Sequence, residues 1–337
     1  MPEPARILYD SRWAGPHGIG RFATEVCRRV RGLAPLQVTF PLFHPLDPWR
    51  LAREVRRIVP PAFFSPGFNA PLATPGVPLV FTVHDLNYVH FAANTTAFKR
   101  AYFALIVKPA CRRAARVLTV SEFSRRQILE WAGIPEHRVV NVGNGVDASF
   151  TPTGERHSPG FPYVLFVGSL APHKNFPRLA RALAQSKAAR EVKLLVTGNP
   201  NDEIARWIER EKLQSMIRFA GVVPDAGLPQ YYRGAVALAM PSLFEGFGLP
   251  VVEAMACGTP VITSTGTSLP EVAGDAALLV EPTNTEAIAD ALEKAVFDAG
   301  LRASLSERGI VRARRFNWDN TAAAVSSELS KATTHRA

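Results

Sequence analysis

Residues 242–263 read Ser-Leu-Phe-Glu-Gly-Phe-Gly-Leu-Pro-Val-Val-Glu-Ala-Met-Ala-Cys-Gly-Thr-Pro-Val-Ile-Thr, a pattern that predicts a glycine-bearing loop, a short helix and a strand. Pro250 suits the first helical position, because the N–H that proline lacks would be unpaired there anyway. Gly258 stands just beyond the apolar run, where glycine commonly ends a helix. This order of elements indicates an α/β fold.

The start of this helix predicts an anion site. Unpaired N–H groups around Gly248, Leu249 and Val251, together with the positive end of the helix dipole, favour a phosphate. Glu245 and Glu253 flank that site, and a carboxylate can accept hydrogen bonds from two neighbouring hydroxyls. The stretch therefore suits a nucleotide sugar, with its diphosphate between two sugar rings. The alternative is a Gly-Pro loop before an ordinary core helix.

The spacing of the two glutamates, with seven residues between Glu245 and Glu253, resembles the paired-glutamate signature of the retaining glycosyltransferases of family 4. The resemblance implies an α/β chain of the GT-B fold, with two Rossmann-like, doubly wound domains facing a central cleft. It also implies that Glu253 holds the ribose of the nucleotide and that Glu245 binds hydroxyls of the donor sugar. The loop residues that it places against the donor are Gly246, Phe247, Gly248 and Leu249.

Length and composition are consistent with two domains. A chain of 337 residues exceeds the usual size of a single core, and 28 prolines and 23 glycines indicate many loops. The sequence has no run of about 18 apolar residues and no apolar signal core at its start, so we expect neither a membrane span nor secretion. The scattered Cys27, Cys111 and Cys257 predict free thiols in a reducing cytoplasm.

The net charge of +10 is concentrated in the first half of the chain. Residues 1–150 carry 19 Lys and Arg against 10 Asp and Glu, whereas the rest carries 20 against 19. This positive charge would favour binding to the anionic inner face of a membrane or to a phosphate-bearing acceptor. Nucleic acid is excluded, because no binding motif and no interleaved stacking aromatics accompany the arginines.

A basic helix is predicted over residues 49–59. Its apolar residues stand at 49, 52, 55 and 58–59 and its arginines at 50, 53, 56 and 57, which helical periodicity places on opposed faces. Such a helix can lie on anionic lipid. The alternative is an ordinary surface helix with its apolar face in the core.

A glycine-rich loop at residues 11–22 follows a predicted strand at 6–10 and opens into a helix that runs to about Arg31. Backbone N–H groups of such a loop can approach a phosphate or a sugar closely. The tight Gly-x-Gly-x-x-Gly spacing of nicotinamide oxidoreductases is absent. In family 4 the similar loop reaches toward the donor, so Gly18 and Gly20 are candidate donor contacts, as is Ile19 between them. A purely structural turn is the alternative.

The predicted strand at 77–86 ends in His84 and Asp85, at the carboxyl end where ligands of open α/β sheets collect. It resembles the His-Asp segment of family 4, in which the histidine points at the donor sugar. The alternative is a histidine satisfied by Asp85 or by the backbone.

A further predicted strand, at 116–121, repeats this arrangement on the acceptor side. Ser121 is placed to cap the next helix. Arg125 and Arg126 follow on that helix, where they add positive potential near an acceptor phosphate. The alternative is a cap and two surface arginines.

The predicted domain boundaries follow the linker composition of residues 151–160. They are an N-terminal acceptor-binding domain at 1–155, a C-terminal nucleotide-sugar-binding domain at 156–315, and a last helix at 316–337. The aromatic pair Phe316 and Trp318 resembles the one with which family 4 enzymes fold this helix back over the N-domain.

Lys174 lies in a loop after the apolar strand that begins at Tyr163, where its ammonium can neutralise a diphosphate leaving group. This segment resembles the phosphate-binding loop of the family, but Ser169 replaces the usual arginine. We expect Lys174 to work with helix N-termini alone, or another arginine or His173 to compensate. Further along, the resemblance places the backbone of Val222 and Val223 beside the nucleobase.

The function that the resemblance implies is transfer of a hexose from a nucleotide sugar to an acceptor hydroxyl, with retention and without a metal or other cofactor. The segments around His84 and Lys174 look most like bacterial mannosyltransferases of surface-polysaccharide synthesis. They make GDP-mannose the first expected donor. An undecaprenyl-diphosphate-linked oligosaccharide would explain the basic N-domain. The alternatives are a GT-B sugar-nucleotide epimerase and a non-catalytic scaffold that binds sugar nucleotides.

Overall fold

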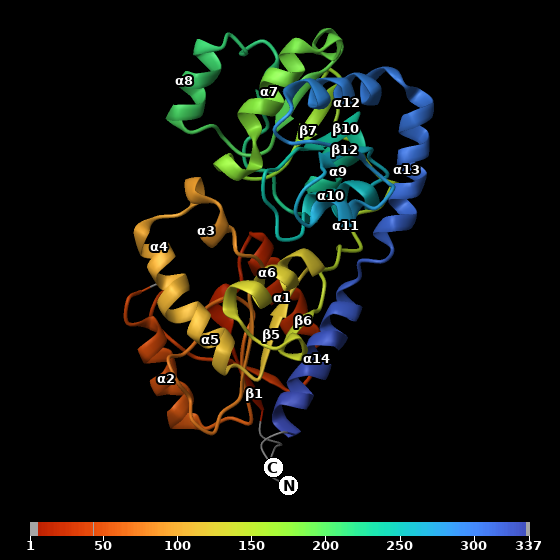
Figure 1. The fold of residues 1–337 in the computed structure, drawn as a ribbon. Coiled ribbons are helices and arrows are strands. Elements are labelled where there is room, and N and C mark those ends of the chain that lie inside the picture. Colours follow the sequence, from red (N-terminus) through yellow and green to blue (C-terminus); the bar gives the residue numbers. More distant parts are fainter. Residues whose placement is uncertain (1–5, 43, 335–337) are drawn as a thin grey trace. The chain divides into compact units, whose positions relative to one another are not determined.

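The computed structural model describes residues 6–42 and 44–334. The chain divides into two compact units, unit 1 with Met1–Gly145 and Asn317–Ala337 and unit 2 with Val146–Phe316. Each unit is a parallel sheet covered by helices (Figure 1), so the predicted pair of Rossmann-like α/β domains is confirmed. Unit 2 begins after Gly145 and ends at Phe316, whereas the predicted domain boundaries lie at residues 155 and 315.

The sheet of unit 1 has six parallel strands in the order β2-β1-β3-β4-β5-β6. Two of them, β2 and β3, were not predicted. Because all strands run in one direction, their carboxyl ends share one edge of the sheet. The strands are β1 (Ile7–Asp10), β2 (Leu33–Leu36), β3 (Phe63–Ser65), β4 (Leu79–Thr82), β5 (Arg116–Thr119) and β6 (Val139–Asn141).

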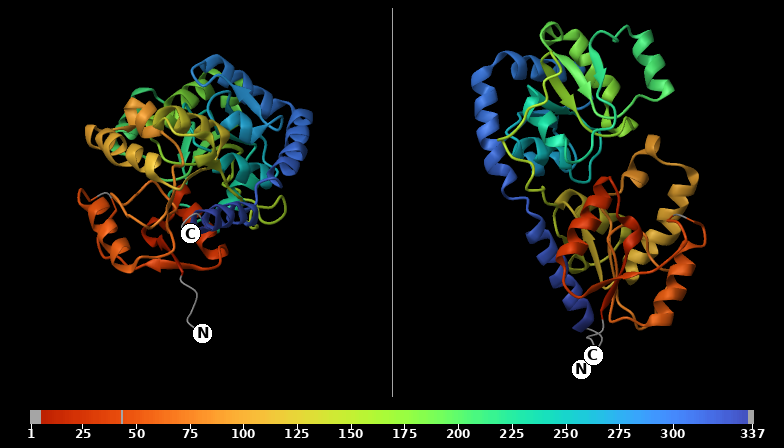
Figure 2. Two further views of the ribbon diagram at one scale, coloured as in Figure 1. Left: turned by 60° about the horizontal axis from the view of Figure 1, so that its bottom comes forward. Right: turned by 180° about the vertical axis from the view of Figure 1, so that it is seen from behind.

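The helices of unit 1 cover this sheet, and the last helix of the chain is one of them. That helix, α14, packs against α1 and β4 (Figure 2), and its Glu328 accepts a hydrogen bond from Arg116 at 2.8 Å. The helices are α1 (Gly18–Arg29), α2 (Asp47–Ile58), α3 (Asn87–His90), α4 (Ala97–Tyr102), a π turn (Phe103–Val107), α5 (Lys108–Arg113), α6 (Glu122–Ala132) and α14 (Trp318–Thr334). Short 3-10 turns are Ser11–Trp13, Ala92–Asn94 and Glu136–Arg138.

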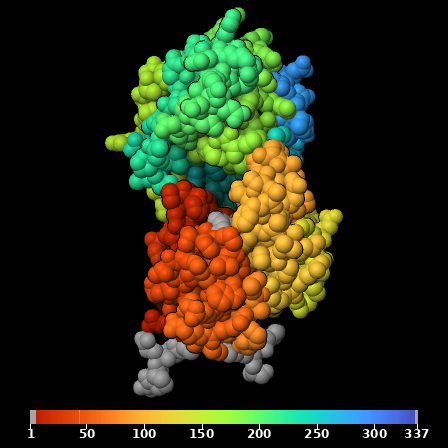
Figure 3. All heavy atoms as spheres, turned by 90° about the vertical axis from the view of Figure 1, so that its left-hand side faces the viewer, coloured from red at the N-terminus to blue at the C-terminus, as the bar shows by residue number. Residues whose placement is uncertain are grey.

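The basic helix forms as α2, and its buried face matches the sequence prediction in part. Ala52 and Val55 are buried as predicted, and Leu51 is buried with them. Trp49 is 52% exposed and Ile58 is 46% exposed, although both were assigned to the apolar face. Figure 3 looks onto the surface of unit 1 that carries α2 (orange) and α4 (light orange). The outer face of α2 therefore combines apolar side chains with arginines.

The sheet of unit 2 also has six parallel strands, in the order β12-β11-β10-β7-β8-β9. The central pair, β10 and β7, brings together loops that are about 70 residues apart in the chain. The strands are β7 (Tyr163–Phe166), β8 (Lys193–Val196), β9 (Ile217–Phe219), β10 (Ala237–Met240), β11 (Val261–Ser264) and β12 (Leu278–Val280).

The last two helices of unit 2 follow each other directly. Asp298 accepts a hydrogen bond from the N–H of Leu301 at 2.8 Å and so starts a new helix after Phe297. That helix continues through Gly309, which packs against Met255. The helices are α7 (Phe176–Gln185), α8 (Asp202–Arg210), α9 (Leu228–Gly234), α10 (Leu249–Ala256), α11 (Leu269–Ala273), α12 (Thr285–Phe297) and α13 (Ala299–Ala313), with 3-10 turns at Pro172–Lys174 and Lys187–Arg190.

No helix in the described ranges combines the length and the apolar character needed to cross a bilayer. Cys27, Cys111 and Cys257 are free thiols, and Cys111 and Cys257 are buried.

Candidate active site

Two predicted residues of unit 2 meet at the carboxyl edge of its sheet. Nζ of Lys174, in the loop after β7, lies 2.7 Å from Oε1 of Glu245, in the loop after β10. Their side chains are only 14% and 11% exposed. The pairing of β7 with β10 explains the contact, since parallel neighbours place their following loops side by side.

Two further contacts fix the Lys174 loop against the Glu245 loop. The side-chain amide of Asn175 donates to the carbonyls of Pro241 at 2.9 Å and Pro282 at 2.7 Å. The N–H of Leu243 donates to the carbonyl of His173 at 2.7 Å. Asn175 has a φ of 61°, in the left-handed region that asparagine tolerates better than most residues. Asn175 positions the lysine, and the sequence analysis did not identify it.

The loop that carries Glu245 needs glycine at Gly248. Its φ is 102°, and a Cβ there would lie 2.7 Å from Cδ2 of Leu269. The hydroxyl of Ser268 bonds to the carbonyls of Glu245 at 2.9 Å and of Phe247 at 3.0 Å. The backbone of the loop is thus held from behind by a fully buried serine.

The anion site at the start of α10 is smaller than predicted. The N–H of Val251 donates to the carbonyl of Gly248 at 2.9 Å, so it is not available to a ligand. Within the described parts of the chain, no acceptor pairs with the N–H of Gly248 or of Leu249. Helix α10 begins at Leu249, which makes Pro250 its second residue instead of its first. Two amide donors and the helix dipole remain for a phosphate.

Glu253 is a buried carboxylate with a specific partner. It is 2% exposed and accepts a hydrogen bond from the hydroxyl of Tyr232 at 2.7 Å. Tyr232 is fully buried on α9, beside α10 (Figure 1), and its carbonyl accepts from Oγ1 of Thr259 at 2.7 Å. No sequence pattern predicts this pair, because nothing distinguishes Tyr232 from the adjacent Tyr231. The hydrogen bond from Tyr232 argues against the alternative in which Glu253 only complements the helix dipole, because that role requires no buried phenol partner.

Ser169, which replaces the usual arginine of the family, lies in a pocket that contains other cations. Ser169 lines a pocket of about 710 Å³ whose wall also includes Arg178 and Arg181. Burial lowers the pKa of His173 to about 4, reinforced by Lys174 and opposed by Glu245. His173 is therefore neutral near pH 7 and does not replace the missing arginine, which corrects one of the two expected substitutes.

Val222 and Val223 follow β9 at the same carboxyl edge. The side chain of Val222 is 82% exposed, and Val223 is half-buried. An antiparallel bridge between Gly198 and Gly221 ties the loop after β8 to this segment. The exposed valine leaves this strand end accessible to a flat ligand such as a base.

In unit 1 His84 is 8% exposed, and its Nε2 lies 2.9 Å from the carbonyl of Pro66. A carbonyl only accepts, so Nε2 carries the proton and Nδ1 is the acceptor of a neutral ring. Burial lowers the pKa of His84 to about 4. Its ring meets Phe22 edge-on at 4.9 Å. The carboxylate of Asp85 accepts from the N–H of Asn87 at 2.9 Å, at the start of α3.

The glycine-rich loop of unit 1 begins α1. Nδ1 of His17 accepts a hydrogen bond from the N–H of Gly20 at 2.9 Å. A Cβ at Gly20 would lie 2.2 Å from the carbonyl oxygen of Gly15, so the close approach of this loop requires glycine. Gly18 and Ile19 occupy the first turn of α1. Gly20 thus has a structural role, and a donor contact of this loop stays a prediction.

Two residues predicted on the acceptor side also have structural partners. Ser121 is buried and caps α6 by accepting from the N–H of Ser124 at 3.0 Å. Nε of Arg125 donates to the carbonyl of Val139 at 3.0 Å. Arg126 is exposed. The acceptor contacts of these residues stay predictions.

No group of three or more His, Cys, Asp or Glu side chains in the described part of the chain is arranged to hold a metal ion.

Two family models divide the chain between them. Glycosyltransferase Family 4 matches residues 8–150, and Glycosyl transferases group 1 matches residues 151–312. The chain belongs to glycosyltransferase family 4. A relative, the O-antigen chain mannosyltransferase B of Escherichia coli, is 30% identical over 289 residues, which are 82% of this chain and 75% of the relative.

Two other relatives match this chain over a smaller share of their own length. The D-inositol 3-phosphate glycosyltransferase of Acidothermus cellulolyticus is 31% identical over 73% of this chain, and the match spans 60% of that relative. A serotype-specific mannosyltransferase WbdA of Escherichia coli is 28% identical, and the match spans 28% of its length.

Solved structures of other proteins share the fold. Anabaena Alr3699/HepE in complex with UDP and glucose superposes with a TM-score of 0.77 at 20% identity, over 97% of this chain and all of that one. WaaG, a glycosyltransferase involved in lipopolysaccharide biosynthesis, has a TM-score of 0.74 at 16% identity, over 95% and 98%. The predicted GT-B fold is confirmed, and the protein is a glycosyltransferase.

Proposed function

We propose that this glycosyltransferase moves mannose from GDP-mannose to a hydroxyl of a glycan or of an undecaprenyl-diphosphate-linked oligosaccharide, with retention of configuration. The observation that carries the proposal is the Lys174–Glu245 ion pair in the unit that also holds the unpaired N–H groups of Gly248 and Leu249. The relatives that support mannose are the Escherichia coli mannosyltransferases. UDP-glucose is the second donor to test, because HepE binds it.

In this proposal the nucleoside diphosphate is the leaving group, and fixed hydrogen-bond donors stabilise the negative charge that develops on it. The ammonium of Lys174 and the two N–H groups of Gly248 and Leu249 need little reorganisation, since Asn175 and Ser268 hold the loops that carry them. Glu245 orients Lys174 and binds hydroxyls of the donor sugar. Glu253, fixed by Tyr232, binds the ribose.

We propose that the reaction needs no metal ion. Lys174, the dipole of α10 and its amide donors offer the positive potential that a divalent cation would otherwise supply. Arg178, in the pocket that Ser169 lines, is the proposed second cation.

We also propose that unit 1 contacts the membrane surface from which a lipid-linked acceptor is taken. The exposed Trp49 of α2 shares its outer face with Arg53 and Arg57, and Ile58 is exposed at the end of the helix. Aromatic and basic side chains on one face are typical of helices that lie on anionic lipid.

The proposal is tested by thermal unfolding of the protein with GDP-, UDP-, dTDP- and ADP-sugars in the presence of EDTA. We expect GDP-mannose to raise the Tm of the wild type but not of Glu253→Gln, which keeps the size of the side chain. Stabilisation by UDP-glucose alone would correct the donor. If no sugar nucleotide shifts the Tm at millimolar concentration, the transferase site as described is wrong.

A further inference from the structure

A basic pocket of unit 1 lies at the amino ends of β4, β5 and β6, the opposite end of the sheet from His84. Its volume is about 680 Å³. The segment 73–79, which precedes β4, forms one wall, and the end of α14 contributes to another. No described residue that lines this pocket is acidic. Nothing in the proposed transfer reaction uses it.

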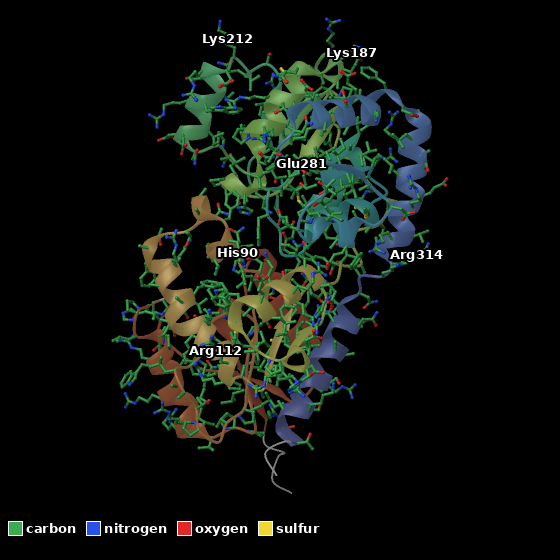
Figure 4. The ribbon with its side chains drawn as sticks, viewed as in Figure 1. His90, Arg112, Lys187, Lys212, Glu281 and Arg314 are labelled. Atoms are coloured by element: carbon green, nitrogen blue, oxygen red, sulfur yellow. The ribbon has the colours of Figure 1, made fainter. Side chains whose placement is uncertain are left out.

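Two arginines of this pocket have no carboxylate partner among the described residues. Arg138 donates one N–H to the carbonyl of Arg112 at 2.9 Å, at the end of α5 (Figure 4). Arg113 donates to the carbonyl of Pro71. Burial lowers the pKa of Arg113, and the neighbouring thiol of Cys111 opposes this effect only in part. Each guanidinium has five N–H donors, so most of them are left for a ligand.

One acid close to the pocket is already neutralised. Glu328 of α14 pairs with Arg116, which lines the pocket, at 2.8 Å, and also with Lys331 at 2.5 Å. The positive charge of Arg113 and Arg138 is therefore not cancelled by Glu328.

We infer that this pocket binds a ligand that carries two linked phosphate groups. Planar guanidinium groups bind phosphate oxygens in pairs, and Arg113 and Arg138 each offer such a group, one for each of two phosphates. The pocket is also larger than one phosphate needs. The phosphates come either from a soluble compound of the pyrophosphate class or from a lipid headgroup.

The test is calorimetric titration of the full chain with inorganic pyrophosphate, with hydrogen exchange of segment 73–79 as the local readout. All proteins carry Lys174→Met, which weakens competition from the donor site. The variants are Arg138→Gln, Arg113→Lys and the double variant Arg113→Gln with Arg138→Gln. The matched control is Arg31→Gln, an exposed arginine just beyond α1 and outside the pocket.

We expect pyrophosphate to slow exchange in segment 73–79, and each glutamine to weaken its affinity about tenfold, as loss of a charge-assisted contact does. Arg31→Gln should change neither. If vesicles that contain phosphatidylglycerol slow exchange there and pyrophosphate does not, the phosphates belong to a lipid. If neither probe protects segment 73–79, or if the double variant binds as tightly as Arg31→Gln, the inference is wrong.

Discussion

Tyr232 is the residue that decides whether Glu253 is a ligand-binding carboxylate or only a buried one. Its hydroxyl donates to Oε2 of Glu253 at 2.7 Å, and both residues are buried. Tyr232→Phe removes one hydrogen bond to a buried charge, which costs about 1–3 kcal/mol of stability. If Glu253 holds the ribose, we expect the KM for the donor to rise about tenfold with kcat little changed. A lower Tm with an unchanged KM would mean that the pair is structural.

Lys174 should matter for the chemical step itself. Lys174→Ala removes the ammonium beside Glu245, and we expect kcat to fall by about two orders of magnitude, the cost of losing one preorganised electrostatic contact. Steady-state release of the nucleoside diphosphate measures the effect. Lys187→Ala, at an exposed lysine of unit 2 (Figure 4), is the matched control and should retain wild-type turnover. Equal turnover in the two variants would exclude Lys174 from the leaving-group site.

His84 and His173 predict how stability depends on pH. Burial lowers the pKa of both from 6.5 to about 4. Between these values the unfolded chain binds protons that the folded protein does not, so acid favours unfolding. We expect the Tm to fall as the pH decreases from 6.5 to 4, and the fall to be smaller in His173→Asn. A Tm that is constant over this range would show that neither histidine is buried in its neutral form.

At the scale of single elements, the outer face of α2 makes a separate prediction. Trp49→Ala with Ile58→Ala removes exposed apolar area and leaves the arginines in place. Binding to vesicles that contain phosphatidylglycerol should weaken about tenfold or more, because buried apolar surface stabilises an interfacial helix. Sedimentation with vesicles measures the effect. Phe297→Ala, at an exposed phenylalanine of α12 in unit 2, is the control and should bind as the wild type does.

The elements differ in how well the sequence predicted them. Segment 242–263 could be interpreted as loop, helix and strand because proline and glycine mark its ends. The strand β3 (Phe63–Ser65) has only three residues, too few for a periodic pattern. The buried face of α2 was predicted only in part, because Leu51, which packs inside with Ala52 and Val55, was not counted with the apolar residues of the helix. Periodicity alone did not select between these two faces.

The contacts within the candidate site were also only partly predictable from the sequence. The sequence identified Lys174 and Glu245 by their loops, but their ion pair depends on β7 lying next to β10, which only the sheet order reveals. Asn175 and Tyr232 were missed for a related reason. Their partners are 66 and 21 residues away, and no local pattern marks such hydrogen bonds.

At the scale of the whole molecule, the two units share one architecture but differ in charge. The half that includes most of unit 1 has a net charge of +9, and the rest of the chain has +1. Unit 1 carries the exposed face of α2 and the pocket of Arg113 and Arg138, whereas unit 2 carries the proposed donor residues. This division predicts that salt weakens membrane and phosphate binding of unit 1 more than it weakens donor binding.

The central claim is tested most directly by the configuration of the first product. The donor selected by thermal unfolding, GDP-mannose by expectation, is incubated with the protein in EDTA, and the anomer of the released or transferred sugar is followed by NMR. We predict that the α-configuration of the donor is kept, that EDTA has no effect, and that Lys174→Ala abolishes the signal. A first product of inverted configuration, or a rate that is unchanged in Lys174→Ala, would contradict the proposed mechanism.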